Sequence, residues 1–356
     1  MKTIEKYVLK EFLKILVLTV GGMTALFLVI DLVEKSDELL KHGFTAALTL
    51  KYLAFKVPSF LTLTMPIALL LSAFISTALL NKHGEISAMK AGGIRLTRVL
   101  VPLFIAAAVI SVAVIILNER VIPFTEGAAT VMMEEKEGKE LAFGSRGVWF
   151  KSGEVIYNVK KIDVEKQSLE GITAYSIKKP FSLEAVATFE KATWTGSTWK
   201  ASGKTTAWKV KNGAPSALKA DAALLSGVKN PSEFAKAEKG IEAMGYKELK
   251  RYIRSLKRGG YDTTAHKVEL QSKLSFPFVN LVMLIIGIPL ALKTGRGAGM
   301  AAGVALSLAI GFAFWVVFGL CKSLGMEGAV PPVVAAWFTP VLFLSIGALM
   351  FSYVKQ

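Results

Sequence analysis

The sequence predicts a membrane α-helical bundle of six transmembrane helices, with an all-β, jelly-roll-like domain inserted between the third helix and the fourth. Two observations carry this prediction. Of the 356 residues 53% are hydrophobic and 20% are charged, so a membrane part and a water-soluble part must both be present. The apolar residues are also gathered into six long runs, which are separated by polar segments and by one stretch of alternating pattern.

Each of the six apolar runs is long enough to cross about 30 Å of hydrocarbon as a helix, in which internal hydrogen bonds satisfy the backbone. The runs cover residues 15–33, 57–80, 99–117, 274–292, 297–321 and 329–354. The first run is too long for a signal peptide and no small-residue cleavage site follows it, so we expect a retained helix. We therefore assign residues 1–118 to helices one to three, and 246–356 to a connecting helix and helices four to six.

The segment between these two parts, residues 119–245, has a different pattern of apolar and polar residues. Its apolar residues alternate with polar ones in short stretches bounded by Gly, Ser, Lys and Asn, which is typical of β-strands. Many short strands without intervening helical patterns indicate a sandwich or a jelly roll. Val148, Phe150, Trp194 and Trp208 are the side chains that we expect to point inward.

The charges of the short loops predict the orientation. Lysine and arginine gather before the first run, between the second and third, and between the fourth and fifth, whereas loops 34–56 and 322–327 are mixed or acidic. The positive-inside rule therefore places both termini in the cytoplasm and the β domain outside it. The formal net charge of +16 follows from this bias and from attraction to anionic lipids, so we expect no nucleic-acid partner.

No catalytic residue, cofactor site or metal site is predicted. The three histidines fall in separate loop regions, and the single cysteine, Cys321, cannot form an intramolecular disulfide. The segment Ser202-Gly-Lys-Thr205 is similar to part of a phosphate-binding loop, but Thr198 occupies the position of its first glycine. We expect a β-turn there, so the chain is not predicted to be an enzyme or to hydrolyse ATP by itself.

Two features have more than one interpretation. Asp31 is the only acid inside an apolar run. It either lines a polar cavity, pairs with Lys35, or extends its carboxylate to the membrane surface without a functional role. In the loop after the second run, Glu85, Ile86 and Met89 share one face of a short helix that paired glycines stop. That helix is either a solvated connector or a coupling helix that presents an acid and apolar side chains to a cytoplasmic partner.

Several segments also match a known family in order and spacing over essentially the whole chain. They are 7–12, 65–68, 84–93, 118–123 and 246–260, followed by the run 274–292 with its Phe276-Pro277 and Ile288-Pro289. Together they resemble the lipopolysaccharide-export permeases whose paired inner-membrane subunits are called LptF and LptG. The segment 328–337 looks more like the LptG side.

The resemblance implies a permease subunit of an ATP-driven ABC exporter in the bacterial inner membrane. Such a subunit pairs with a sister permease as an LptF/LptG heterodimer and binds a dimeric cytoplasmic ATPase. It extracts lipopolysaccharide and passes it to periplasmic bridge proteins of similar β fold. Extraction moves several acyl chains out of the bilayer at about 0.8 kcal/mol per methylene, so an external energy source is required.

The resemblance also implies roles for individual residues. Glu85, Ile86 and Met89 would sit in a groove of the ATPase, which makes the segment near 82–93 a coupling helix. Lipopolysaccharide would be bound by Lys35, Lys41 and Asp31, with the lysines meeting its phosphates as point charges.

Two other functions stay open at this point. A secondary transporter should carry ionisable residues inside its spans and inverted repeats, but the spans carry almost none apart from Asp31. In a membrane scaffold with a periplasmic docking domain, charge reversal at Glu85 should leave glycolipid transport intact.

Overall fold

The computed structural model describes most of the chain. The described residues are 3–41, 43–137, 148–152, 154–163, 167–178, 182–211, 214–218, 225, 227–228, 244–258, 262–294 and 299–353. They divide into two compact units, the first made of residues 1–131, 241–253 and 262–356 and the second of 132–240 and 254–261. The first unit holds the helices that could span a membrane, and the second holds a β-sheet.

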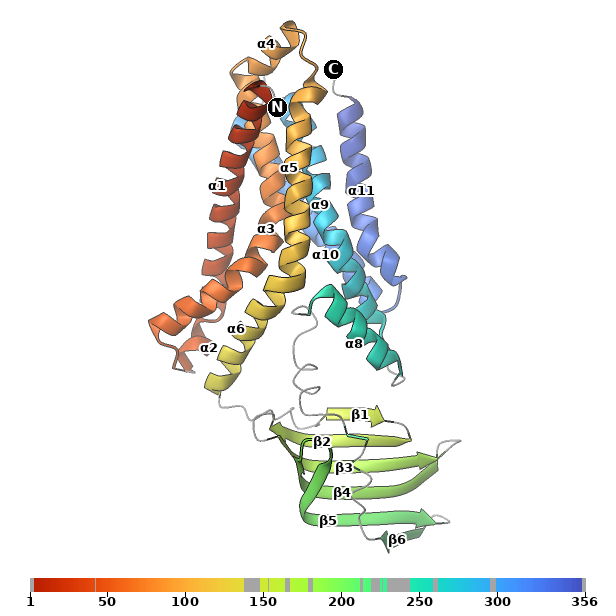
Figure 1. The fold of residues 1–356 in the computed structure, drawn as a ribbon. Coiled ribbons are helices and arrows are strands. Elements are labelled where there is room, and N and C mark those ends of the chain that lie inside the picture. The colour runs from red at the N-terminus through yellow and green to blue at the C-terminus, as the bar shows by residue number, and fades with distance from the viewer. Residues whose placement is uncertain are drawn as a thin grey trace. The chain divides into compact units, whose positions relative to one another are not determined.

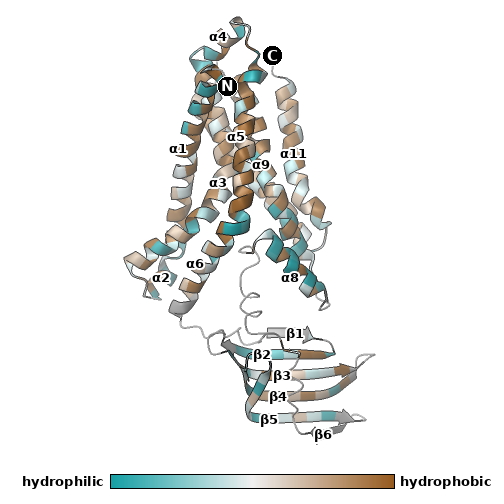
Figure 2. Cartoon of the chain, in the orientation of Figure 1, coloured by the Kyte–Doolittle hydropathy of each residue, from teal (hydrophilic) through white to brown (hydrophobic). Residues whose placement is uncertain are grey.

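Within the described residues, six helices are long and apolar enough to cross a membrane, which confirms the six predicted spans. They are α1 (Thr3–Glu34), α3 (Ala46–Lys82), α5 (Leu96–Ile116) with its continuation, α9 (Thr264–Thr294), α10 (Met300–Met326) and α11 (Pro332–Ser352). In Figure 1 they lie together as one bundle, and Figure 2 shows hydrophobic colouring along α5. The short helices α2 (Ser36–Lys41), α4 (Glu85–Ala91) and α8 (Tyr246–Arg258) lie between them in the chain.

The third span continues past residue 118, where we assigned the start of the inserted domain. A π-helical turn, η1 (Leu117–Val121), joins α5 to α6 (Ile122–Glu137) without a break in the helical run. Glu119 in this turn accepts a hydrogen bond from the backbone N–H of Lys247 at 3.3 Å. The end of the third span is therefore tied to the start of α8.

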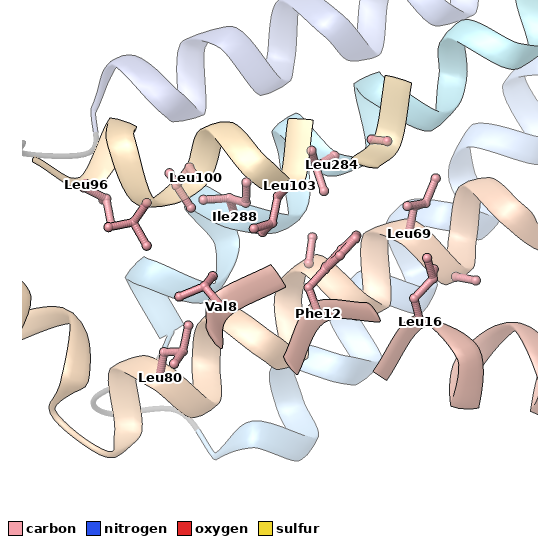
Figure 3. Close-up of a cluster of buried hydrophobic side chains, with 14 of the residues drawn as sticks. Val8, Phe12, Leu16, Leu69, Leu80, Leu96, Leu100, Leu103, Leu284 and Ile288 are labelled. Atoms are coloured by element: carbon pink, nitrogen blue, oxygen red, sulfur yellow. The ribbon is translucent and has the colours of Figure 1, made fainter. Parts of the chain in front are cut away.

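The core of the helical unit is built from α1, α3, α5 and α9. Figure 3 shows side chains of these four helices pointing toward one another, namely Val8, Phe12, Leu16, Leu69, Leu80, Leu96, Leu100, Leu103, Leu284 and Ile288. In the most apolar 18-residue stretch of α3, and in that of α9, 72% of the residues are buried. In the corresponding stretch of α1 only 17% are buried. The central helices are therefore α3 and α9, and α1 has a wide outward face. Close packing rather than water exclusion holds such helices together in lipid.

Glycine permits the closest contacts in this bundle. A Cβ at Gly303 of α10 would lie 2.7 Å from Cε2 of Phe74 in α3. A Cβ at Gly287 of α9 would lie 2.8 Å from the carbonyl oxygen of Leu70. Both helices approach α3 at a distance that a larger side chain does not allow, as small residues do at transmembrane helix interfaces.

The second unit is an antiparallel β-sheet, which confirms the all-β prediction. Its described strands are β1 (Val148–Ser152), β2 (Val155–Asp163), β3 (Ser168–Lys178), β4 (Ser182–Trp194), β5 (Trp199–Lys211) and β6 (Ala214–Leu218). They lie in one sheet in the order β1-β2-β3-β4-β5-β6, so each described strand pairs with its neighbour in the chain (Figure 1). A jelly roll pairs strands that are distant in sequence across two sheets, and these described strands do not show that topology.

One face of the sheet forms a core of its own, and it corrects one predicted inward residue. Trp194 is partly buried against this core, as expected. Trp208 is 48% exposed, and the buried position next to it belongs to Ala207, so the predicted inward orientation of Trp208 is wrong. The side chains of Val148 and Phe150 lie outside the described residues.

Candidate functional site

The first candidate site is the short helix α4, in the loop where the sequence predicts a helix stopped by paired glycines. It follows Gly84, which has a left-handed φ of +76°, and ends at Ala91 before Gly92 and Gly93. In Figure 1 it lies at the same end of the bundle as the first turn of α1 and the last turn of α11. The loop is therefore a compact structure between two spans, and α4 is its only helix among the described residues.

Glu85 begins α4 and is held by a contact that sequence reasoning missed. Its Oε1 accepts a hydrogen bond from the hydroxyl of Tyr7 in α1 at 3.1 Å, and Nδ1 of His83 lies 3.9 Å from the same atom. The side chain is still 30% exposed. Tyr7 belongs to a segment that matched the family, but its partner 78 residues later cannot be read from the sequence. Glu85 thus links α4 to α1 and keeps an accessible carboxylate.

The two apolar residues of the predicted coupling surface face inward. Ile86 is only 5% exposed and belongs to the core shared by α1, α3, α5 and α9, and Met89 packs partly against that core. The prediction that Ile86 is presented to a partner therefore differs from the structure. It anchors α4 to the bundle instead, while Ala88 and Ala91 are exposed on the opposite side.

The second candidate site lies at the other end of α1 and α3, and we call it the polar cluster. It consists of Asp31, Lys35, Tyr52, Lys56 and Glu126. The ring of Tyr52, 1% exposed, lies beneath two ammonium groups, with its centroid 5.5 Å from Nζ of Lys35 and 5.9 Å from Nζ of Lys56. Nζ of Lys56 also donates to Oε2 of Glu126 at 2.7 Å, in a partly buried ion pair.

The polar cluster contains two buried oxygens that lack a well-formed hydrogen bond. Oδ2 of Asp31 and the hydroxyl of Tyr52 are buried, and neither forms a hydrogen bond of normal length and angle within the described chain. The Asp31 carboxylate nevertheless lies near enough to the Tyr52 hydroxyl to interact with it and to accept a weak hydrogen bond from it. Leaving a buried polar atom unpaired costs about 1–3 kcal/mol, so this position favours water or a polar ligand group that supplies the missing bonds.

The lysines predicted to bind substrate lie at this same end but differ in their surroundings. Lys35 is half-buried above Tyr52, and Lys41 is exposed in the last turn of α2. Neither forms an ion pair with a described carboxylate, so both ammonium groups are available to an external anion. Of the predicted residues the structure brings Asp31 and Lys35 together around Tyr52. It adds Tyr52, Lys56 and Glu126, which the sequence analysis missed.

The segment similar to a phosphate-binding loop lies inside β5, where an irregularity in strand pairing replaces the expected β-turn. Gly203 has a φ of +85°, and a Cβ there would lie 2.8 Å from Oε2 of Glu190 on β4. The same carboxylate oxygen accepts the backbone N–H of Lys204 at 2.7 Å. A carboxylate therefore fills the position that a phosphate would need. Among the residues that the structure describes, no group of three His, Cys, Asp or Glu side chains could hold a metal ion.

The comparison with protein families gives a match over nearly the whole chain. The family model described as lipopolysaccharide export system permease LptF/LptG matches residues 6–353. The chain belongs to this family. With its six apolar helices it is a multi-pass inner-membrane permease of the LptF/LptG type.

Curated relatives agree with membership of the LptF/LptG family. The lipopolysaccharide export system permease protein LptG of Escherichia coli strain K12 is 20% identical over 353 residues, which cover 96% of each chain. The protein of the same description from Escherichia coli O6:H1 gives the same identity and coverage. The similarity thus includes both the spans and the inserted β domain.

Proposed function

We propose that this chain is the LptG-type subunit of an ATP-driven exporter that extracts lipopolysaccharide from the inner membrane and passes it to a periplasmic bridge of similar β fold. The observation that carries the proposal is the family match over residues 6–353 of a six-span bundle with an inserted β-sheet. Its partners are a sister permease, in an LptF/LptG heterodimer, and a dimeric cytoplasmic ATPase. The ATPase supplies the energy that removal of several acyl chains from a bilayer requires.

The proposed orientation rests on the two ends of the bundle. The start of α1, α4 and the end of α11 share one end (Figure 1), and the lysine-rich loops belong to that end. We assign it to the cytoplasm by the positive-inside rule. The chain enters the β domain after α6, at the other end of the third span, which assigns that domain to the periplasm.

Coupling to the ATPase is proposed to act through α4. Glu85 offers an accessible carboxylate at the start of the helix, and Ile86 and Met89 fix the helix to the core. A partner that displaces α4 therefore moves side chains that contact α1, α3, α5 and α9, because packed cores transmit displacement rather than absorb it. In this proposal Glu85 meets the partner, and Ile86 and Met89 transmit the movement.

Substrate binding is proposed at the polar cluster and at Lys41. The unpaired ammonium groups of Lys35 and Lys41 suit the phosphates of lipopolysaccharide. Oδ2 of Asp31 can accept a hydrogen bond from a sugar hydroxyl, which would satisfy a buried acceptor. Tyr52 holds Lys35 in place from below.

The first experiment purifies the tagged chain from its native membrane in mild detergent and identifies what co-purifies at fixed stoichiometry. A second six-span permease and a cytoplasmic ATPase are expected. Recovery of the chain alone, under conditions that preserve a known membrane complex, would contradict the exporter proposal. A secondary transporter or a membrane scaffold would then be favoured, and Asp31 would be the next residue to substitute.

Coupling is tested with Glu85→Lys, which is expected to abolish extraction while the protein still inserts, because a cation replaces the anion that the partner meets. Glu327→Lys, an exposed reversal just after α10, is the matched control. Tyr7→Phe removes the internal hydrogen bond and leaves the carboxylate in place, so it separates loss of the α1 contact from loss of the partner contact. Normal extraction by Glu85→Lys would exclude the coupling role.

Substrate binding is tested by crosslinking lipopolysaccharide to α1. Lys35→Glu is expected to weaken the crosslink, and Lys51→Glu is the control, because Lys51 also lies over an aromatic ring, that of Phe55, on the neighbouring helix. Equal crosslinking in the wild type and in Lys35→Glu would remove Lys35 from the site.

A further inference from the structure

Tyr7 of α1 holds a position to which the export proposal gives no role of its own. Its ring is 43% exposed, while the next residue, Val8, is 1% exposed and packs in the core of the helical unit. Its hydroxyl donates to Oε1 of Glu85 at 3.1 Å. The main chain of Tyr7 is therefore fixed by the bundle, and its hydroxyl reaches across to the first residue of α4.

The first turns of α1 are also attached to α5. Nε of Arg98, near the start of α5, donates to Oε1 of Glu5 at 3.3 Å. The side chain of Glu5 is only 16% exposed, so solvent weakens this pair less than a fully exposed one. Tyr7 thus extends from a helix end that is held by two other parts of the bundle, and it is a stable point of attachment for α4.

The apolar contacts of α4 leave its rotation open. Ile86 and Met89 pack against the core, but apolar contacts are non-directional and tolerate rotation of a short helix about its axis. The helix begins after Gly84, which has no side chain to form a capping hydrogen bond. A hydrogen bond is directional, because it weakens steeply when donor and acceptor are misaligned. The bond from Tyr7 therefore restricts both the rotation of α4 and the direction of the Glu85 carboxylate.

The carboxylate of Glu85 keeps one oxygen for a partner. The hydroxyl of Tyr7 and the ring of His83 both lie against Oε1, and Oε2 has no hydrogen-bond partner among the described residues. A carboxylate offers about four acceptor positions, so Tyr7 can hold Oε1 while Oε2 accepts a hydrogen bond from another protein. Tyr7 therefore orients the acid without competing for it.

We infer that Tyr7 is a positioning residue for coupling, whose hydroxyl orients the Glu85 carboxylate so that α4 meets the cytoplasmic ATPase with this acid already in place. The inference rests on the proposed coupling role of Glu85. Restricting a side chain before association lowers the entropy that is lost on binding. The net contribution of one such hydrogen bond corresponds to about three- to tenfold in affinity.

The test measures the affinity of the full-length chain in detergent for the cytoplasmic ATPase that co-purifies with it. Tyr7→Phe keeps the ring and removes only the hydroxyl, and it is expected to weaken binding by about three- to tenfold. Tyr353→Phe is the matched control, since Tyr353 is 74% exposed just after α11, at the same end of the bundle, and wild-type binding is expected. Tighter binding by Tyr7→Phe would overturn the inference, because Tyr7 would then compete with the ATPase for Glu85.

A double-mutant cycle shows whether Tyr7 acts through Glu85. Glu85→Ala removes the acceptor, so Tyr7→Phe/Glu85→Ala is expected to bind no more weakly than Glu85→Ala alone. Additive losses would overturn the inference, because a merely structural role of Tyr7 does not depend on Glu85. Wild-type binding by Glu85→Ala would contradict the coupling proposal and the inference with it. Weak binding by Glu85→Ala together with wild-type binding by Tyr7→Phe would overturn the positioning role alone.

A second measurement needs no ATPase. A spin label at Ala88→Cys, in a chain that also carries Cys321→Ser, reports the motion of α4 from its exposed side. Tyr7→Phe is expected to sharpen the spectrum of this label, because α4 loses a contact that restricts its rotation. Identical spectra with and without the Tyr7 hydroxyl would overturn the inference even if ATPase binding were weakened.

Discussion

The contact between Gly303 and Phe74 allows a sharp test of the packing of α10 against α3. In Gly303→Ala the new Cβ would lie closest to Cζ of Phe74 and 2.7 Å from its Cε2, whereas carbon atoms in contact are normally about 3.5–4.0 Å apart. The ring is 1% exposed and cannot turn out of the core, so it or the helix must move by more than about 1 Å. Overpacking of this kind costs about 1–3 kcal/mol of folding free energy.

The matched control is Gly319→Ala on the same helix, since a Cβ at that position meets nothing within 4 Å. Both substitutions gain the same helix propensity, about 1 kcal/mol in water, so this contribution cancels between them. The difference in stability between the variants is therefore the packing cost alone. We expect Gly303→Ala to unfold at a lower temperature than Gly319→Ala when the purified chain is heated in detergent and followed by tryptophan fluorescence.

A second substitution distinguishes a local clash from a general loss of helix packing. Phe74→Leu shortens the side chain that meets the new methyl group, so Phe74→Leu/Gly303→Ala is expected to lose less stability than the two single changes added together. Equal unfolding temperatures for Gly303→Ala and Gly319→Ala would refute the predicted contact. Strict additivity in the double variant would refute it independently.

Three further predictions concern the ends of the helices and the sheet. Lys56→Gln breaks the partly buried pair with Glu126 and is expected to cost about 1–2 kcal/mol in thermal unfolding, with Glu126→Gln restoring part of the loss. Trp208→Thr should change sheet stability by less than about 0.5 kcal/mol, because the ring is exposed, and a larger loss would contradict its outward orientation. Hydrogen bonds from Thr264 lower the pKa of Asp262. Its stabilising contribution is present above the unfolded pKa of about 3.9 and is lost as pH falls through the lower folded value. The protection of amides in the first turn of α9, taken as their exchange rate relative to the intrinsic rate at the same pH, should therefore decrease at acid pH in the wild type and not in Asp262→Asn.

The existence of the spans could be predicted because hydrocarbon imposes length and composition on each helix. Their ends could not be predicted from the same rule. The first apolar run begins at Ile15, whereas α1 begins at Thr3, and η1 carries the third span past Leu117. Helices continue into the polar region, where charged side chains are stable and hydropathy no longer marks the boundary.

The short helix near 82–93 could also be predicted from its composition and its glycines, but the direction of its faces could not. Spacing places Glu85 and Met89 on one side of a helix, and only the tertiary structure decides which side meets the bundle. The same limit applies to the sheet. Alternation in β5 indicates a strand, but it does not show which of the two faces is buried. The buried face is the one that carries Ala207, because the core residues of the neighbouring strands lie on that face.

The missed part of the polar cluster follows from sequence separation. Lys56 and Glu126 are 70 residues apart, and each is an ordinary charged residue at the edge of an apolar segment. Only their meeting makes a partly buried ion pair, so no local pattern indicates it. The Tyr52–Lys56 spacing of one helical turn is a local signal, and it indicates a shared face without identifying Lys35, in the turn after α1, as the second cation.

One helix connects both candidate sites. Near one end of α3, Leu80 shares a core with Ile86 of α4, and near the other end Lys56 pairs with Glu126 of α6. The 24 residues between them span about 36 Å of helix, most of it buried among the other spans. A displacement of α4 along α3 would therefore reach the polar cluster without a hinge at either site. Cysteine crosslinks that fix α3 to α9 should then block extraction even when Glu85 and Lys35 are intact, and normal extraction by the crosslinked protein would exclude α3 as the moving element.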